Sequence, residues 1–345
     1  MAEKYSRVTQ MLGKQSISFV NPVYIQGSAS IVGKKEGEGP LGHHFDAVEE
    51  DDKFGQKTWE EAENVMQQKS AGMAVEKADL QMTDIRMIFA GDLLAQSTAS
   101  SFGIGALGCP VYGLFGACST MGESLALAAM VVAAGYGDNV MAVTSSHFAT
   151  AEKEFRFPLG YGNQRPLSAS WTVTGSGACV VSAKESRVKI TGVTTGKIID
   201  YGLKDSQNMG ACMAPAACST IVQNLKDFGR NPDDYDKIIT GDLGYVGQQI
   251  LLDLLEKEGY TAAKAHQDCG ILIYDREKQD THSGGSGCGC SAVVLASYII
   301  PKIACGDWKR VLFVPTGALM SKVSFYEGNS VPGIAQAVVL ENAEN

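Results

Sequence analysis

Positively charged residues, long hydrophobic runs and paired cysteines are all scarce in this chain. Its 345 residues include 29 Lys and Arg against 38 Asp and Glu, a formal net charge of −9, so nothing in the charge balance favours binding to nucleic acid. The longest apolar stretches, 125–135 and 292–303, are too short to span a bilayer. We therefore expect neither a nucleic-acid partner nor a transmembrane segment.

The sequence also lacks a leader and a cysteine framework. Met1–Arg7 contains no apolar stretch of the kind found in signal peptides. The nine cysteines are odd in number, and Cys288 and Cys290 are separated by one residue, too close for a CxxC redox or zinc motif. We expect reduced thiols, a cytoplasmic location and no metal site.

Length and composition indicate a folded protein. Hydrophobic residues make up 45% of the chain and charged residues 19%, which is ordinary globular composition. A chain of 345 residues is long enough for about two domains. The 39 glycines are in excess, so we expect many backbone positions that turn tightly or pack closely against a neighbour.

One sequence pattern occurs twice. The segment DIRMIFAGDL at 84–93 returns as DYDKIITGDL at 234–243, and a predicted helix precedes each copy, at 58–73 and at 215–228. The first of these helices begins with a Thr-x-x-Glu capping box at Thr58. Further along, Cys118-Ser119 and Cys290-Ser291 each open an apolar helix that leads into an apolar strand.

Two landmarks in the same order favour duplication of one βαβαβ unit over coincidence. Short apolar strands suit a buried parallel sheet, and the β-rich runs 172–182 and 187–199 join the two units. We predict an α/β protein with one half at 1–185, which carries Cys118, and a second half at 186–345. The two Cys-Ser helices should begin near a pseudo-twofold axis.

Cys118 occupies a position that suits a nucleophile. The segment GACSTMGES at 116–124 follows the apolar strand 111–115 and places the cysteine at the start of a buried helix, where Thr120 and Glu123 match a second capping box. Free N–H groups at a helix N-terminus lower the pKa of a thiol and also bind carboxylates. Cys118 is thus a nucleophile or ligand contact, or else an inert buried thiol.

A duplicated five-element unit with a cysteine at the start of the first buried helix resembles the thiolase fold, over residues 17–340. This resemblance implies two βαβαβ halves layered α-β-α-β-α, and in thiolases and ketoacyl synthases the cysteine attacks an acyl thioester. Seven stretches resemble one branch of the fold, the stage V sporulation protein AD family. They are GPLG at 39–42, AGDLL at 90–94, FGACST at 115–120, TSSH at 144–147, TGSGA at 174–178, MAPAA at 213–217 and GGSGC at 284–288.

The partners that acyl transfer requires are missing from the matching positions. Where ketoacyl synthases carry a histidine, this chain has GDLG at 241–244, and before the second apolar helix it has GCGCS at 287–291, without histidine or asparagine. Removing such partners costs several orders of magnitude in rate. The pattern therefore favours a binding protein over an enzyme; an acyltransferase or condensing enzyme with Cys118 as nucleophile is the alternative, and a docking subunit with a vestigial pocket is the third.

The family resemblance implies that the chain binds dipicolinic acid (pyridine-2,6-dicarboxylate) and supports its uptake into the developing spore. A flat dianion needs an aromatic-sized slot, N–H donors and a cation or bridging metal. We expect no cofactor apart from calcium that arrives as part of the ligand. The candidate ligand-binding residues lie around the cysteine helices and the loops beside them; they are Cys118, Ser119, Thr120, His147, Arg156, Arg165, Asp242 and Cys290.

Some of these assignments have local alternatives. Arg156 is equally placed to contact the ligand or to pair with Glu152 or Glu154 at the surface. Asp92 and Asp242 occupy matching repeat positions at strand ends, where ligands of α/β sheets often bind; we expect Asp92 to be structural and Asp242 to reach the pocket. The resemblance further implies a homodimer, which we place at the run 172–182, membrane-protein partners of the same sporulation system, and a peripheral position at the spore inner membrane.

Overall fold

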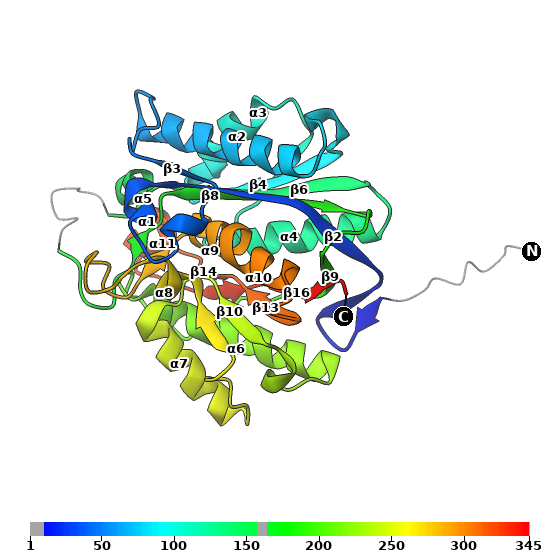
Figure 1. Cartoon of the computed structure of the whole chain (residues 1–345). Coiled ribbons are helices and arrows are strands. Elements are labelled where there is room, and N and C mark those ends of the chain that lie inside the picture. Colours follow the sequence, from blue (N-terminus) through cyan, green and yellow to red (C-terminus); the bar gives the residue numbers. More distant parts are fainter. Residues whose placement is uncertain (1–9, 157–163, 345) are drawn as a thin grey trace, which may run out of the picture.

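Two sets of five strands form the central sheet of the protein, whose computed structural model describes residues 10–156 and 164–344 (Figure 1). The first set, in spatial order, is β5 (Val111–Gly113), β4 (Met87–Gly91), β6 (Asn139–Ser146), β8 (Gly175–Ser182) and β2 (Ser16–Gly33). The second is β11 (His266–Asp268), β10 (Lys237–Thr240), β13 (Arg310–Val314), β16 (Ala337–Asn342) and β9 (Val188–Thr194).

The two sets have the same topology. In each, the strands stand in the order third, second, fourth, fifth, first along the chain, and the fifth strand runs antiparallel to both neighbours. The first strands of the two sets, β2 and β9, pair antiparallel with each other and join the sets into one sheet. Two short strands, β1 (Met11–Leu12) and β3 (Ala47–Glu49), are added on β2. The predicted duplication is confirmed.

Helices form three layers around the two strand sets (Figure 1). The outer faces are covered by α2 (Trp59–Lys77) and α3 (Thr98–Gly105) on the first set and by α6 (Met209–Phe228) and α7 (Gly244–Lys257) on the second. Between the sets lie α4 (Thr120–Ala133), α9 (Cys288–Val294) and α10 (Ile300–Ala304), the last two joined by a π-helical stretch at Leu295–Ile299. This is the predicted α-β-α-β-α architecture.

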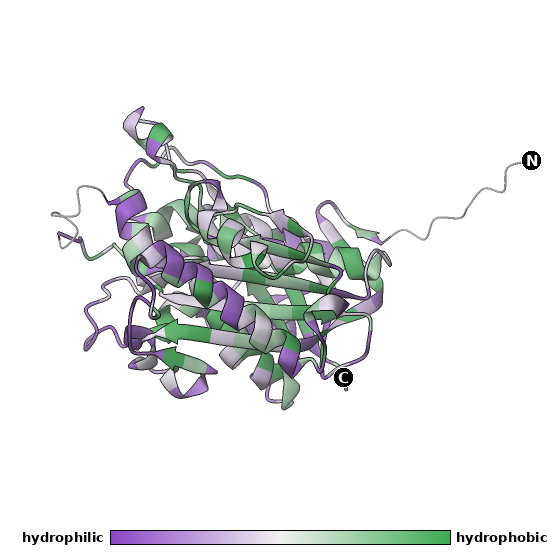
Figure 2. Cartoon of the chain, turned by 90° about the horizontal axis from the view of Figure 1, so that it is seen from above, coloured by the Kyte–Doolittle hydropathy of each residue, from purple (hydrophilic) through white to green (hydrophobic). Residues whose placement is uncertain are grey.

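Hydropathy follows these layers. The strands are mostly hydrophobic, whereas the outer helices carry hydrophilic residues (Figure 2). The largest core cluster lies around the central helices, where Leu125, Val293 and Phe313 are fully buried. No helix among residues 10–156 and 164–344 is long and apolar enough to cross a membrane.

Helix starts show where local signals succeed and fail. At α2 the capping box is confirmed: the hydroxyl of Thr58 accepts from the Glu61 N–H at 3.2 Å, and the Glu61 carboxylate accepts from the Thr58 N–H at 3.2 Å. The predicted start of α6 at Pro215 is wrong, because the helix begins six residues earlier, after the cap Asn208. Proline is usual in a first turn, but here it stands in the second.

The predicted dimer contact at 172–182 is also wrong. Strand β8 pairs with β2 on one edge and with β6 on the other, and all eight of its residues are buried. Neither its edges nor its faces are available to a second chain. The β-rich character of this run reflects its central place in the sheet.

Close packing of a central helix on the sheet depends on Gly177. A Cβ at this position of β8 would lie 2.5 Å from the backbone C and O atoms of Ala292 in α9. We expect Gly177→Ala to reduce the free energy of unfolding by about 1–3 kcal/mol, because backbone atoms cannot give way as a flexible side chain can. Urea denaturation measures this loss.

Gly72→Ala is the matched control. Gly72 lies in α2 with no atom within 4 Å of its hypothetical Cβ, so the same substitution should stabilise by about 0.5–1 kcal/mol. Equal stability of Gly177→Ala and wild type would contradict the close contact between β8 and α9.

Candidate functional site

Cys118 lies at a tight, strained turn between β5 and α4. The preceding residue, Ala117, has a φ of +50°, a left-handed conformation that is unfavourable for any residue except glycine. The N–H groups of Ser119 and Thr120 donate to the carbonyls of Gly116 and Ala117 at 3.1 and 3.2 Å. Their hydroxyls donate to the same two carbonyls at 2.7 and 2.6 Å.

The turn therefore uses its own hydrogen-bonding groups. Ser119 and Thr120 are fully buried and line neither of the two cavities described below, so their contact with a ligand stays a prediction. Thr120 begins the helix, and its side chain makes no cap to the helix backbone. Thr120 and Glu123 thus form no capping box.

Asp242, from the other half of the chain, stands behind Cys118. The Cys118 thiol lies beside the Asp242 carboxylate, which accepts from the Gly287 N–H at 3.0 Å and the Thr316 hydroxyl at 2.8 Å. Burial raises the pKa of Asp242 to about 7. Asp242 is 3% exposed and lines neither cavity described below, so it reaches a ligand only through Cys118.

The same surroundings keep Cys118 protonated. Burial, and then the charge of Asp242, raise the pKa of the thiol well above its usual value. The sequence argument predicts the opposite shift from the helix N-terminus, but desolvation of a thiolate outweighs that potential at a fully buried site. Cys118 is held as a hydrogen-bond donor rather than as a nucleophilic thiolate.

Cys288, not Cys290, is the second-half counterpart of Cys118. Helix α9 begins at Cys288. The residue before each of the two cysteines has a positive φ, +103° at Gly287 and +50° at Ala117. Cys288 and Cys118 lie in one buried cluster. Cys290 sits two residues further into the helix, within the main core, and lines neither cavity; its assignment to ligand binding stays a prediction.

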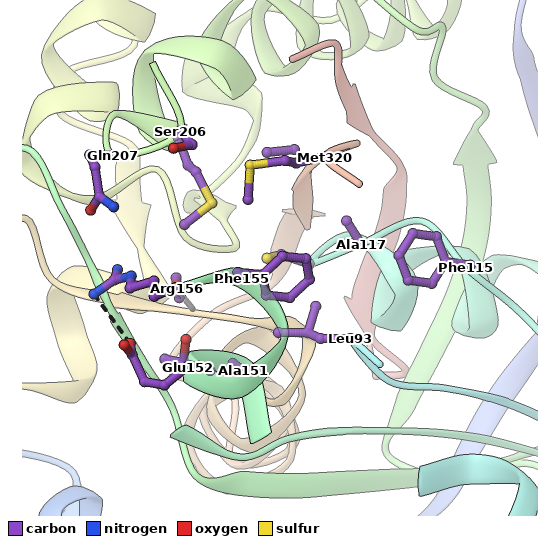
Figure 3. A pocket seen from close by; sticks show the side chains of 15 residues that line it. Leu93, Phe115, Ala117, Ala151, Glu152, Phe155, Arg156, Ser206, Gln207 and Met320 are labelled. Carbon is purple, nitrogen blue, oxygen red and sulfur yellow. Dashed lines mark ion pairs between the residues drawn. The ribbon is translucent and has the colours of Figure 1, made fainter. Parts of the chain in front are cut away.

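Cys118 opens onto a narrow cavity, which we term the Cys118 cavity (Figure 3). Among the described residues that line it, the one cation is Arg156, which follows α5 (Phe148–Phe155). The other side chains are mainly apolar, with the carboxylate of Glu152 and a few hydroxyl and amide groups. The described lining is Leu93, Phe115, Ala117, Cys118, Ala151, Glu152, Phe155, Arg156, Thr172, Ser206, Gln207, Met209, Ser286, Ala318 and Met320.

Arg156 is only partly satisfied in this cavity. Its Nη2 donates to the carbonyl of Ser170 at 3.1 Å, and its Nη1 lies 3.2 Å from Oε1 of Glu152 (Figure 3). The guanidinium is 13% exposed and Nη1 makes no hydrogen bond, because the ion pair lacks the required alignment. Both alternatives for Arg156 therefore hold in part: it pairs with Glu152, and it also faces the cavity.

A second, wider cavity of about 840 Å³ adjoins the first, and Glu152 lines both. We term it the Trp171 cavity. His147 and Arg165 line it, so the structure separates them from Cys118 and Arg156. His147 caps α5: Nδ1 accepts from the Ala149 N–H at 3.1 Å, and Nε2 bonds the Asp52 carbonyl at 2.7 Å.

A network of buried polar side chains connects α2 with β6 and α5, and no sequence pattern predicts it. The carboxylate of Glu63, in α2, accepts from the hydroxyls of Ser145 and Thr150 at 2.9 and 2.8 Å. Asp92 accepts from the N–H and hydroxyl of Ser100, both at 2.7 Å, which agrees with its expected structural role. Burial and the charge of Asp92 raise the pKa of Glu63 to about 8.

Solved structures with this architecture belong to the thiolase-like class. The 3-oxoacyl-[acyl-carrier-protein] synthase III of Aquifex aeolicus VF5 is similar over 92% of this chain and 99% of its own, with a TM-score of 0.57 and 16% identity. Cerulenin-bound OleA of Xanthomonas campestris is similar over 95% and 97%, with a TM-score of 0.56 and 16% identity. These likenesses, with the duplicated topology, define the protein as one with a thiolase-like fold.

Sequence comparison identifies the family within that class. A family profile described as "Stage V sporulation protein AD (SpoVAD)" matches residues 13–341. Stage V sporulation protein AD of Bacillus subtilis (strain 168) is 43% identical over 334 residues, 97% of this chain and 98% of that protein. The chain belongs to the stage V sporulation protein AD family of sporulation proteins.

The buried carboxyl groups make a prediction about pH. Glu36 and Asp242 have pKa values raised to about 7, and Glu63 to about 8, all by burial. The folded state therefore holds protons that the unfolded chain releases above pH 4.5, so the free energy of unfolding should fall as pH rises from about 5 to 8. Urea unfolding at several pH values measures the slope.

Glu63→Gln tests the contribution of one group. The amide cannot titrate, so the variant should lose less stability than wild type between pH 5 and 8, by up to about 1.4 kcal/mol per pH unit. Glu61→Gln, an exposed neighbour on α2, should leave the slope unchanged. A wild-type stability that rises across this interval would contradict the proton assignment.

Proposed function

We propose that this protein binds dipicolinic acid, free or as its calcium chelate, in the Cys118 cavity and supports its uptake into the developing spore. Membership of the sporulation family supports a role in the developing spore. The observation that carries the site is Arg156: a buried guanidinium whose Nη1 makes no hydrogen bond, at the wall of a mainly apolar cavity. Nη1 lies 3.2 Å from Oε1 of Glu152 without the alignment of a hydrogen bond. A buried donor left without a hydrogen bond is costly, and a ligand carboxylate would satisfy it.

The rest of the cavity suits the remainder of the ligand. Leu93, Phe155 and Met320 offer apolar faces for a flat ring, while Thr172, Ser206 and Gln207 bring polar groups for a second carboxylate. Cys118 contributes the sulfur edge of its protonated thiol, which does not repel an anion as a thiolate would.

Calcium enters this proposal only with the ligand. No group of three or more His, Cys, Asp or Glu side chains in the described part of the chain is placed to hold a metal ion. One guanidinium neutralises one carboxylate of a dianion, so a chelated Ca²⁺ would offset the second charge. We therefore expect calcium to strengthen binding rather than to be required for folding.

An acyltransferase or condensing enzyme with Cys118 as nucleophile is the alternative function. The fold of the ketosynthase-like structures favours it. Against it, burial and the charge of Asp242 raise the pKa of Cys118, and Asp242 rather than a histidine base stands beside the thiol. Incubation with acyl thioesters and mass spectrometry separates the two functions. An acyl adduct on Cys118 at neutral pH would sustain the alternative.

Dipicolinate is a dianion and crosses a hydrocarbon layer only with the help of a protein. The proposal therefore includes membrane-protein partners of the same sporulation system and a peripheral position at the spore inner membrane. Fractionation of sporulating cells tests this part, and a protein found only outside the membrane fractions would contradict it.

A homodimer remains part of the proposal, at a different surface from the one predicted. Strand β5 ends the sheet of the described residues, and its free edge exposes hydrogen-bonding groups that a second copy can pair. Val111 on β5 is 46% exposed and Phe102 on the adjacent α3 is 68% exposed. We expect light scattering to give the mass of a dimer for wild type and of a monomer for Val111→Glu.

Val323→Glu is the matched control for the dimer. Val323 is equally apolar, 68% exposed, and lies on α11 (Lys322–Tyr326) rather than at the sheet edge, so its substitution should leave the dimer intact. A wild-type protein with the mass of a monomer would refute the dimer outright.

The main test is calorimetric titration of dipicolinate, with and without calcium, into wild type and Arg156→Gln. Loss of a charge-assisted hydrogen bond of about 1.5–3 kcal/mol should weaken binding roughly 10- to 100-fold. Cys118→Ala should weaken it less, and acetyl-CoA should not bind.

Arg86→Gln is the control, because Arg86 is an exposed arginine that lines neither cavity. The proposal fails if dipicolinate produces no heat under either condition. It also fails in its location if Arg156→Gln binds as tightly as wild type.

A further inference from the structure

We propose that the Trp171 cavity is a second binding site, separate from the Cys118 cavity, for a small molecule that carries a carboxylate or phosphate group. Its basic lining residues are Lys34, Lys35 and Arg165, of which Lys34 is exposed and paired with Glu50 at the rim. The proposal rests on the proposed function only for one of its ligands, dipicolinate. Its geometry is independent of Cys118 and Arg156.

An aromatic platform holds the two cations together. Trp171, on β7 (Trp171–Thr172), stacks on Phe148 with ring centroids 3.9 Å apart and an angle of 7° between the rings. Nζ of Lys35 lies 4.2 Å from the Trp171 centroid, and Cζ of Arg165 lies 4.9 Å from it. Because Phe148 fills one face of the indole, both cations lie over the other face.

Neither cation has a buried anionic partner of its own. Lys35 donates to a neutral group, the carbonyl of Gln279, at 2.6 Å. Arg165 pairs with Asp280 at 2.8 Å, but that carboxylate is 76% exposed and therefore strongly screened by solvent. The Arg165 side chain is only 7% exposed, and its buried Nη1 has no hydrogen-bond partner.

Acidic side chains also line this cavity, but the structure engages them elsewhere or leaves them at its rim. Glu36 is buried and accepts from the Tyr274 hydroxyl and from the Thr174 N–H at 3.0 Å. Glu152 faces Arg156. Glu38 and Asp52 are exposed. Two neighbouring cations repel each other across a short distance, and an oxyanion between them relieves that repulsion and satisfies Nη1 of Arg165.

The size and walls of the cavity limit the ligand. A volume of about 840 Å³ admits an organic molecule of moderate size as well as a simple anion. Trp59 also lines it and offers apolar contact to a planar ring beside the cations. Glu152 lines both cavities, so a molecule held here stands next to the first site.

Titration calorimetry with two probes, dipicolinate and inorganic phosphate, tests the inference. We expect wild type to bind two molecules of dipicolinate per chain. Lys35→Gln and Arg165→Gln should each abolish dipicolinate binding in the Trp171 cavity or weaken it tenfold or more. Arg156→Gln should do the same for binding in the Cys118 cavity. Phosphate should bind once, and this event should be lost in Lys35→Gln but kept in Arg156→Gln.

Two further variants control for folding and charge. Lys226→Gln alters a lysine that is exposed, paired with Glu258 at 3.8 Å and outside the lining of both cavities, and should change neither binding event. Lys35→Arg keeps the positive charge and should retain the second event, which a merely structural role for Lys35 would not predict. Circular dichroism establishes that each variant is folded.

The outcomes separate the two proposals. One dipicolinate event, lost in Arg156→Gln and unchanged in Lys35→Gln, together with no phosphate binding, overturns the second site and leaves the proposed function standing. Phosphate binding that depends on Lys35, without any dipicolinate binding, supports the second site and overturns the proposed function. No heat with either probe overturns both.

Discussion

The contact between the Cys118 turn and Asp242 joins the two halves of the molecule at the wall of the Cys118 cavity. Cys118 belongs to the first half, whereas Asp242, Gly287 and Thr316 belong to the second, and Asp242 accepts buried hydrogen bonds from Gly287 and Thr316 beside the thiol. Gly317 approaches the same turn so closely that a Cβ there would lie 2.2 Å from the Gly116 carbonyl. The strained turn persists because the opposite half encloses it.

This contact also changes the chemistry that the fold suggests. A cysteine at a helix start has the position of a nucleophile, but an acidic neighbour and complete burial make it a neutral donor. The position of the reactive cysteine is thus occupied by a buried thiol beside a carboxylate. The fold is retained, but the pKa of Cys118 is raised instead of lowered.

Sequence reasoning recovered what depends on local pattern. The repeated strands, the capping box at Thr58 and the two buried central helices follow from periodicity, caps and apolar runs, which each segment carries by itself. The first turn of α6 is not predictable from Pro215, because proline usually marks the start of a helix and here lies inside it. The repeated dipeptide Cys-Ser points to Cys290 as the counterpart of Cys118. The true equivalence, between Cys118 and Cys288, depends on backbone conformation at Ala117 and Gly287.

The site was harder to predict because its parts come from distant segments. Arg156 and Arg165 are nine residues apart, yet they face different cavities, and the side chain that separates them, Glu152, was considered only as a surface partner. Lys35 and Trp171 are brought together only by the folded chain, and the Glu63 network unites α2, β6 and α5. Such convergence leaves no periodic trace in a sequence.

The ladder between β2 and β9 has a mechanical consequence. Because these strands make the two halves one continuous sheet, the halves cannot open and close around a ligand like a hinged clamp without breaking backbone hydrogen bonds in the middle of the molecule. A ligand of either proposed site would enter and leave past side chains and loops at the cavity mouth. Its capture and release would then depend on individual side chains rather than on domain motion.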